Sequence, residues 1–278
     1  MARPPSAFSE GQGSESDGVP RRAPVIVRFS ATERAFHWGV ALPTLVLLVT
    51  GLFLRFGWLQ SLMVGYDRRV GLRLHLVAGA AFLFGPLLVI LFGNRHPLAE
   101  AARTLLRMDR GDLRFLRDLP RWLRNDPEAG GDVGRFNGGQ KLNTLVSGIT
   151  LLIATATGVF LWVSPPLSNA ATGAIPVPIS WVAIVHEATT YILLPVLIGH
   201  LFMALVHPRT RESLRGILFG FVDAEWACRH HPRWYREVDG AARPQALSAV
   251  DQGAIQTTAG PAPPWPVGGR GKKTPGRT

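Results

Sequence analysis

Four long runs without a charged side chain constrain this sequence more than any other feature. They cover residues 35–54, 74–94, 142–186 and 188–208. An apolar helix of about 20 residues is long enough to cross a bilayer. The third run is longer than one span and has a proline-rich part, residues 164–180, which we interpret as a loop. We therefore expect an all-α membrane protein, a bundle of four transmembrane helices. The expected spans are about residues 36–54, 72–92, 142–163 and 181–206.

Basic residues are unevenly distributed among the segments that join these runs. Of the 30 Lys and Arg residues, 26 lie before the first run, between the second and third, or after the fourth, and 4 lie between the first and second. Loops rich in Lys and Arg stay on the cytoplasmic side. We therefore expect a bacterial inner-membrane protein with both termini in the cytoplasm. The net charge of +11 is then a topology signal, and we expect no nucleic-acid partner.

The polar segments divide the chain into three parts. Residues 1–27 are rich in Ser, Gly and Pro and lack the apolar core of a signal peptide, and residues 238–278 are of low complexity. We expect both to be disordered cytoplasmic tails around a membrane domain over residues 28–237. Residues 93–141 contain one or two amphipathic patterns typical of helices on a membrane surface. The single cysteine, Cys228, argues against disulfides, covalently attached haem and cysteine-ligated iron–sulfur clusters.

Four of the eight histidines lie in or at the ends of the predicted spans, where an imidazole is costly without a partner. By the predicted topology, His37 and His200 lie near the inner face of the membrane, and His75 and His186 lie near the outer face. Each level thus has one pair that joins two helices. His186 and His200 are 14 residues apart, which is close to four helical turns and a rise of about 21 Å.

Paired histidines at two levels are typical of a cytochrome b that holds two haems between its helices. Two neutral imidazoles per iron give an electron carrier without an open coordination site. Gly51 and Gly79 are placed to let a flat macrocycle approach. His207 competes with His200 for the inner site, but we interpret His207 and His96 as solvated residues of the headgroup zone. A haem-free membrane anchor or a proton-relay protein that uses the same histidines is the alternative.

Four stretches of the sequence resemble the gamma subunit of respiratory formate dehydrogenase, a membrane-anchoring cytochrome b. They are RFSATERAFHW (28–38), RLHLVAG (73–79), GRFNGGQK (134–141) and HHPRWYRE (230–237). The spacing of the two histidines in the fourth span fits as well. The resemblance implies that His37 and His200 ligate the inner haem and that His75 and His186 ligate the outer haem.

The resemblance also implies a menaquinone or ubiquinone site beside the inner haem, formed by Asn137, Gly139 and Gln140. Amide groups can donate to a quinone carbonyl, and glycine lets the backbone come close. An ordinary loop-to-helix junction is the alternative, because Asn-Gly-Gly is typical of turns. HHPRWYRE has the alternatives of a metal-binding tract, a docking segment, or a cytoplasmic packing or lipid-facing element, and we assign it no chemistry. Glu187 departs from the family pattern, in which a small residue follows the outer ligand.

The function that the resemblance implies is electron transfer across the membrane. A molybdenum- or tungsten-containing alpha subunit oxidises formate, and an iron–sulfur beta subunit passes the electrons to this chain. The chain itself is expected to have no formate-oxidising site and to pass electrons through two haems b to quinone. The alternative is the cytochrome b subunit of another quinone-linked oxidoreductase, such as a hydrogenase or a thiosulfate reductase.

Overall fold

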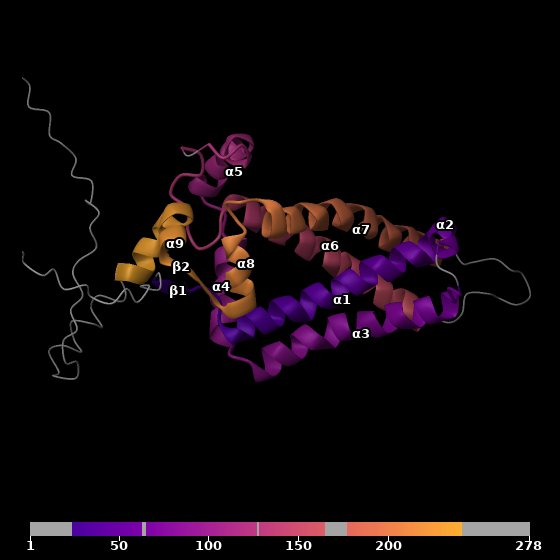
Figure 1. Cartoon of the computed structure of the whole chain (residues 1–278). Coiled ribbons are helices and arrows are strands. Elements are labelled where there is room, and N and C mark those ends of the chain that lie inside the picture. Colours follow the sequence, from indigo (N-terminus) through magenta and orange to yellow (C-terminus); the bar gives the residue numbers. More distant parts are fainter. Residues whose placement is uncertain (1–23, 63–64, 127, 165–176, 241–278) are drawn as a thin grey trace, which may run out of the picture. The chain divides into compact units, whose positions relative to one another are not determined.

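Four long apolar helices form the body of the protein and confirm the predicted fold class (Figure 1). The computed structural model describes residues 24–62, 65–126, 128–164 and 177–240. Most of the tails expected over residues 1–27 and 238–278, and of the loop expected over residues 164–180, lies outside these described residues. The ends of these predictions are wrong, because residues 25–27 form a strand, residues 177–180 begin the fourth long helix and residues 238–240 are helical. The helices are α1 (Ala31–Arg55), α3 (Arg68–Phe92), α6 (Gly138–Val163) and α7 (Val177–Leu201), and α7 continues into a π-helix, η1 (Phe202–Val206).

The first three long helices begin earlier than their hydropathy predicts, because a polar side chain caps each of them. Ser30 and Glu33 form a capping box at the start of α1, and Asn137 and Gln140 form another at the start of α6. The carboxylate of Asp67 accepts a backbone N–H in the first turn of α3. Because these first turns contain charged residues, a prediction based on uncharged runs places the start of each helix too late.

The long helices pack as two neighbouring pairs, with α1 along α3 and α6 along α7 (Figure 1). Small residues allow α1 and α3 to approach closely, since a Cβ built on Gly39 would lie 3.7 Å from the backbone nitrogen of Pro86. In the apolar windows of the four helices, only 6–17% of the residues are buried. Most of the apolar surface therefore faces outward, as expected where lipid surrounds the helices.

Most of the shorter elements gather at one end of the bundle, where α1 and α6 begin and α3 and η1 end (Figure 1). They are α4 (Arg95–Leu106), α5 (Arg110–Leu123), α8 (Glu212–Phe219), α9 (Ala224–His230) and the strands β1 (Val25–Val27) and β2 (Phe221–Asp223), whereas α2 (Gly57–Ser61) lies at the other end. Helices α4 and α5 confirm the prediction that the amphipathic patterns of residues 93–141 form helices. The antiparallel pairing of β1 with β2 was not predicted, because three-residue strands leave no clear periodicity.

The deepest packing of side chains also lies at this end. Phe115 and Trp122 of α5 form a buried cluster with two residues of the α5–α6 connection, Ala129 and Val133, and Met203 of η1 packs against it. The described residues up to Arg236 belong to one compact unit.

Candidate functional site

The two histidine pairs predicted from topology meet in space. The ring centres of His75 and His186 lie 6.3 Å apart, and those of His37 and His200 also lie 6.3 Å apart. A metal ion between two imidazoles requires a similar separation, because two metal–nitrogen bonds of about 2 Å each add to two ring radii of about 1.2 Å. Each pair thus has the spacing of two axial ligands on one iron.

Hydrogen bonds determine which nitrogen of His75 is free. The hydroxyl oxygen of Thr50 on α1 lies 2.8 Å from His75 Nδ1 and 2.7 Å from the carbonyl oxygen of Val46. A hydroxyl has one proton, and the carbonyl of Val46 accepts it. His75 Nδ1 therefore carries a proton and donates it to Thr50, which leaves the lone pair of Nε2 for a metal.

His186 has the same arrangement on the other helix pair. The hydroxyl of Thr157 on α6 donates to the carbonyl oxygen of Ile153 at 2.7 Å and lies 3.0 Å from His186 Nδ1. The carbonyl oxygen of Ala154 lies 3.1 Å from the same nitrogen. Because a carbonyl oxygen can only accept, His186 Nδ1 is the protonated nitrogen and Nε2 is again free.

A glycine follows each threonine and lets the imidazole approach its helix. A Cβ built on Gly51 would lie 3.5 Å from His75 Cε1, and one on Gly158 would lie 3.1 Å from His186 Cε1. The prediction from sequence included Gly51 but missed Thr50, Thr157 and Gly158. A signal for them was present, because the pattern Thr-Gly-x-Phe-Leu occurs at residues 50–54 and again at 157–161.

His75 and His186 both line a mostly apolar cavity. Small and aliphatic side chains from all four long helices line it beside the two imidazoles: Leu47, Gly79, Ala80, Ala154, Gly158 and Leu193. Gly79 was predicted near a haem and does line this cavity. Two imidazoles with free Nε2 atoms in an apolar, four-helix setting fit a haem b, whose macrocycle is flat and apolar.

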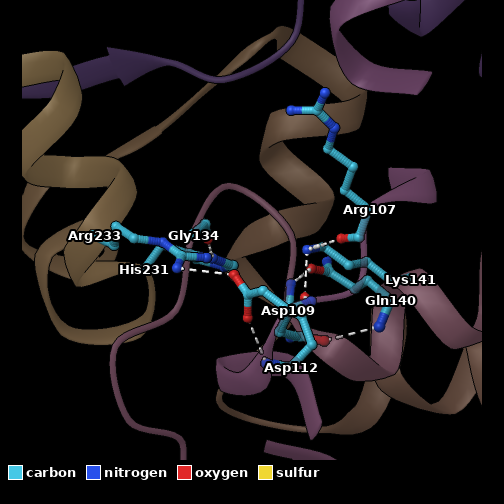
Figure 2. Close-up of polar contacts among 9 residues, drawn as sticks. Arg107, Asp109, Asp112, Gly134, Gln140, Lys141, His231 and Arg233 are labelled. Atoms are coloured by element: carbon cyan, nitrogen blue, oxygen red, sulfur yellow. Dashed lines mark hydrogen bonds and ion pairs between the residues drawn. The ribbon is translucent and has the colours of Figure 1, made fainter. Parts of the chain in front are cut away.

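Asn137, Gly139 and Gln140 lie at the start of α6, and Figure 2 shows Gln140 there. The side-chain oxygen of Asn137 accepts from the Gln140 backbone N–H at 2.8 Å, and that of Gln140 accepts from the Asn137 backbone N–H at 3.0 Å. The helix thus uses both amide oxygens. Neither side-chain NH₂ group donates a hydrogen bond within the described part of the chain, so both remain able to donate to a ligand.

A buried ion pair lies immediately beside this junction (Figure 2). Lys141 Nζ is 2.6 Å from Asp112 Oδ2 and 2.8 Å from the carbonyl oxygen of Arg107, and both charged side chains are only 4% exposed. Asp112 also accepts the backbone N–H of Asp109 at 2.9 Å. The pair joins the start of α5 to the start of α6, and a Cβ on Gly138 would lie 2.5 Å from the Asp112 carbonyl oxygen. The glycine after Asn137 is therefore required for this contact.

Three of the four stretches that carry the family resemblance meet at Arg28. Its guanidinium lies over the rings of Trp226 and Trp234, at 5.1 and 5.4 Å from their centres. Nη2 of Arg28 lies 3.1 Å from both the carbonyl oxygen of Arg135 and His231 Nε2. Burial, and then the charge of Arg135, lowers the pKa of Arg28 to about 9. These stretches therefore share a structural role.

His231 explains part of the stretch HHPRWYRE, which had no assigned chemistry. The ring is 3% exposed and donates from Nδ1 to the carbonyl oxygen of Gly134 at 2.7 Å (Figure 2). Burial, and then the charge of Arg28, lowers the pKa of His231 well below its usual range. Within the described residues, no three His, Cys, Asp or Glu side chains form a group that could hold a metal ion. The packing role is the interpretation that the structure supports.

The interpretation of His207 as a solvated residue is wrong. Its ring is 3% exposed and stacks on Trp122, with ring centres 4.9 Å apart, because α5 packs against the end of η1. His96 is exposed, as expected.

Glu187 is the residue that departs from the family pattern. Its carboxylate pairs with Arg55 and accepts the Tyr191 hydroxyl at 2.7 Å. It joins α7 to the end of α1.

Comparison with known proteins places these features in a family. A family model described as prokaryotic cytochrome b561 matches residues 28–220. The formate dehydrogenase cytochrome b556(fdo) subunit of Escherichia coli K12 is 31% identical over 221 residues, which cover 78% of this chain and 95% of the relative. The nitrate-inducible formate dehydrogenase cytochrome b556(Fdn) subunit of the same strain is 26% identical over 221 residues, with coverages of 79% and 94%.

A relative from Haemophilus influenzae, a formate dehydrogenase cytochrome b556 subunit, is 24% identical over 239 residues, which cover 84% of this chain and 90% of the relative. The region matched by the family model contains all four long helices and both histidine pairs. The chain therefore belongs to the prokaryotic cytochrome b561 family of membrane proteins, a membership that implies haem b as its cofactor.

Proposed function

We propose that this chain is the membrane-anchoring cytochrome b subunit of a formate dehydrogenase, which passes electrons from an iron–sulfur subunit to quinone. The observation that carries the proposal is the pair of histidine sites at two levels of one bundle, each with ring centres 6.3 Å apart. The names of the relatives at 24–31% identity supply the partner enzyme. The expected partners are the iron–sulfur beta subunit and the molybdenum- or tungsten-containing alpha subunit.

Each of the four histidines has one role in this proposal. His75 and His186 would hold one haem b, and His37 and His200 would hold a second. Haem b supplies one-electron transfer when it is bound. Hydrogen bonds hold the imidazoles of His75 and His186 with Nε2 free. Two imidazoles at each level would leave a bound haem without an open coordination site, and mostly apolar side chains line the outer site.

The distribution of basic residues supports an orientation for the bundle. The end where α4, α5, α8 and α9 gather carries most of the arginines and would lie in the cytoplasm of a bacterial inner membrane. His37 and His200 are then at the inner level, and His75 and His186 are at the outer level. Electrons would enter at the outer level from a partner on that face.

The quinone, menaquinone or ubiquinone, would bind at the cytoplasmic end, at Asn137, Gly139 and Gln140. The support is that both amide NH₂ groups are free to donate while their oxygens cap α6. Loss of one such donor weakens binding by about 0.5–1.5 kcal/mol, which is a change of roughly threefold to tenfold.

The experiment that tests the function uses the intact complex purified from membranes. We expect two non-covalent haems per chain, fully extracted by acid–acetone, that formate reduces and a quinone analogue reoxidises. Reduction of the haems by hydrogen and not by formate, or oxidation of reduced haems by thiosulfate, would assign the chain to another oxidoreductase. An absence of haem would refute the proposal in favour of a haem-free anchor.

A single substitution tests the quinone site separately. Gln140→Ala should slow the reoxidation of formate-reduced haems by a quinone analogue while both haems stay bound. Gln140→Glu keeps the capping oxygen of the side chain and removes the NH₂ donor, so it separates capping from ligand binding. Reoxidation at the wild-type rate in both variants would show that this junction only starts α6.

A further inference from the structure

The hydroxyls of Thr50 and Thr157 are unusual among the polar groups of the long helices, because each contacts a histidine of the outer pair. His75 Nδ1 donates to Thr50 at 2.8 Å, and His186 Nδ1 donates to Thr157 at 3.0 Å while sharing its proton with the Ala154 carbonyl oxygen at 3.1 Å. Each hydroxyl in turn donates to a backbone carbonyl one helical turn earlier, at 2.7 Å. A hydroxyl that donates its own proton in this way is a stronger acceptor, because consecutive hydrogen bonds polarise one another.

The inner pair has a different environment. In the part of the chain that the structure describes, no hydrogen bond reaches a ring nitrogen of His37 or His200. The nearest aromatic group to His37 is Trp38, with ring centres 5.4 Å apart and the planes nearly perpendicular. The two levels of the bundle therefore have the same ligand type and the same ring separation but differ in what the other ring nitrogen contacts.

We propose that Thr50 and Thr157 are positioning residues that lower the reduction potential of the outer haem relative to the inner one. The proposal rests on the assignment of His75 and His186 as haem ligands in the proposed function. Together with the glycine after each, the threonines form a matched pair of supports, one on α1 and one on α6.

The physical reason is the effect of an acceptor on the far nitrogen of a metal-bound imidazole. When Nδ1–H donates to a good acceptor, the ring gains electron density, and Nε2 becomes a stronger donor to the iron. A stronger axial donor stabilises the ferric form more than the ferrous form, so the reduction potential falls. The inner haem, without such acceptors, keeps a higher potential, and the gradient favours electron flow from the outer level to the inner level.

A purely structural explanation has to be separated from this one. Threonines in helices often donate to the carbonyl one turn earlier without any further role. Thr155 on α6 does so, at 2.7 Å from the carbonyl oxygen of Leu151, and it contacts no histidine. It is the matched control for the loss of a hydroxyl from the same helix.

The test is an optical redox titration of both haems in purified wild-type complex and in variants. Thr50→Val and Thr157→Val keep the side-chain shape and remove the hydroxyl. One net hydrogen bond changes an equilibrium constant by roughly threefold to tenfold, so Thr50→Val should raise the outer potential correspondingly, where tenfold is about 59 mV for one electron. Thr157→Val should raise it less, because the Ala154 carbonyl oxygen still accepts from His186 Nδ1. The inner potential, measured in the same molecules, should not change. A His186→Ala variant identifies the outer haem by its loss.

Rescue and control variants decide the result. Thr50→Ser and Thr157→Ser retain the hydroxyl and should retain the wild-type potential, and Thr155→Val should leave both potentials unchanged. An equal shift of both haems, an equal shift in Thr155→Val, or unchanged potentials in both valine variants would overturn the inference. Loss of the outer haem from both valine variants would show that the hydroxyls only hold the rings in place. A wild-type protein without haem would instead refute the proposed function.

Discussion

Replacing Lys141 by Met breaks the buried ion pair at the start of α6 and tests how this end of the bundle is held together. Lys141 Nζ lies 2.6 Å from Asp112 Oδ2, and both side chains are 4% exposed. Methionine keeps most of the length and volume of the lysine side chain but removes its charge. Asp112 Oδ2, the oxygen that Lys141 contacts, would then have one hydrogen-bond partner left, the backbone N–H of Asp109.

The expected loss is large because a carboxylate remains buried without its counter-ion. Removal of one partner from a buried pair costs about 3–5 kcal/mol. A matched control exists on the surface, where Arg236 lies 2.6 Å from Asp132 but the two side chains are 61% and 58% exposed. Exposed pairs contribute about 0–1 kcal/mol, so Arg236→Met should change the free energy of unfolding by no more than that.

The assay is unfolding of the purified protein in mixed detergent micelles, followed by tryptophan fluorescence, because Trp122 lies in the adjacent buried cluster. The double variant Lys141→Met/Asp112→Leu removes both charges and should recover much of the loss, since apolar groups can replace a buried pair. If Lys141→Met were as mild as Arg236→Met, the pair would be hydrated, and burial could not be the source of its contribution. If the double variant were no better than the single one, the cost would come from packing and not from the unpaired charge.

Three further results are expected. His200→Ala should remove the inner haem from the pyridine haemochrome assay while His207→Ala keeps it, since His207 stacks on Trp122; the opposite result would exchange the two ligands. Gly158→Val should reduce the outer haem content, because even a Cβ there lies 3.1 Å from His186 Cε1; full occupancy would show that the ring can move aside. The pKa of His231 is lowered in the fold from 6.5, so the unfolded chain binds more protons at low pH; the free energy of unfolding should fall as pH drops below about 6.5 and be level above it. A His231→Gln variant should show a weaker dependence, the rest coming from His230, whose pKa burial also lowers; an unchanged pH profile in that variant would assign the dependence to other groups.

The uncharged runs in the sequence were sufficient to predict the transmembrane architecture. A helix in lipid must satisfy its own backbone hydrogen bonds, so an uncharged run of spanning length has few alternatives to a membrane helix. The alternation of spans and loops then placed His75 with His186 and His37 with His200, because each helix reverses the direction of the one before it. These predictions needed only the order of residues along the chain.

The helix boundaries and the buried charges could not be predicted from hydropathy alone. Three helices begin with polar caps, at Ser30, Asp67 and Asn137, which an apolar window excludes although capping residues are readable in principle. Lys141 and Asp112 are 29 residues apart, and each alone resembles an ordinary surface charge. Only the packing of α5 on α6 shows that both are buried.

The sequence by itself determined the number of spans, the two levels of histidines and the family resemblance, because spacing along a helix and the length of a bilayer are one-dimensional constraints. The tertiary structure decided which groups stand behind those histidines. Thr50 reaches His75 across α1 and α3, and Thr157 reaches His186 across α6 and α7. Such contacts depend on the rotation of each helix about its own axis. Hydrophobicity does not determine that rotation, because lipid and protein core are equally apolar, so packing between the helices sets it.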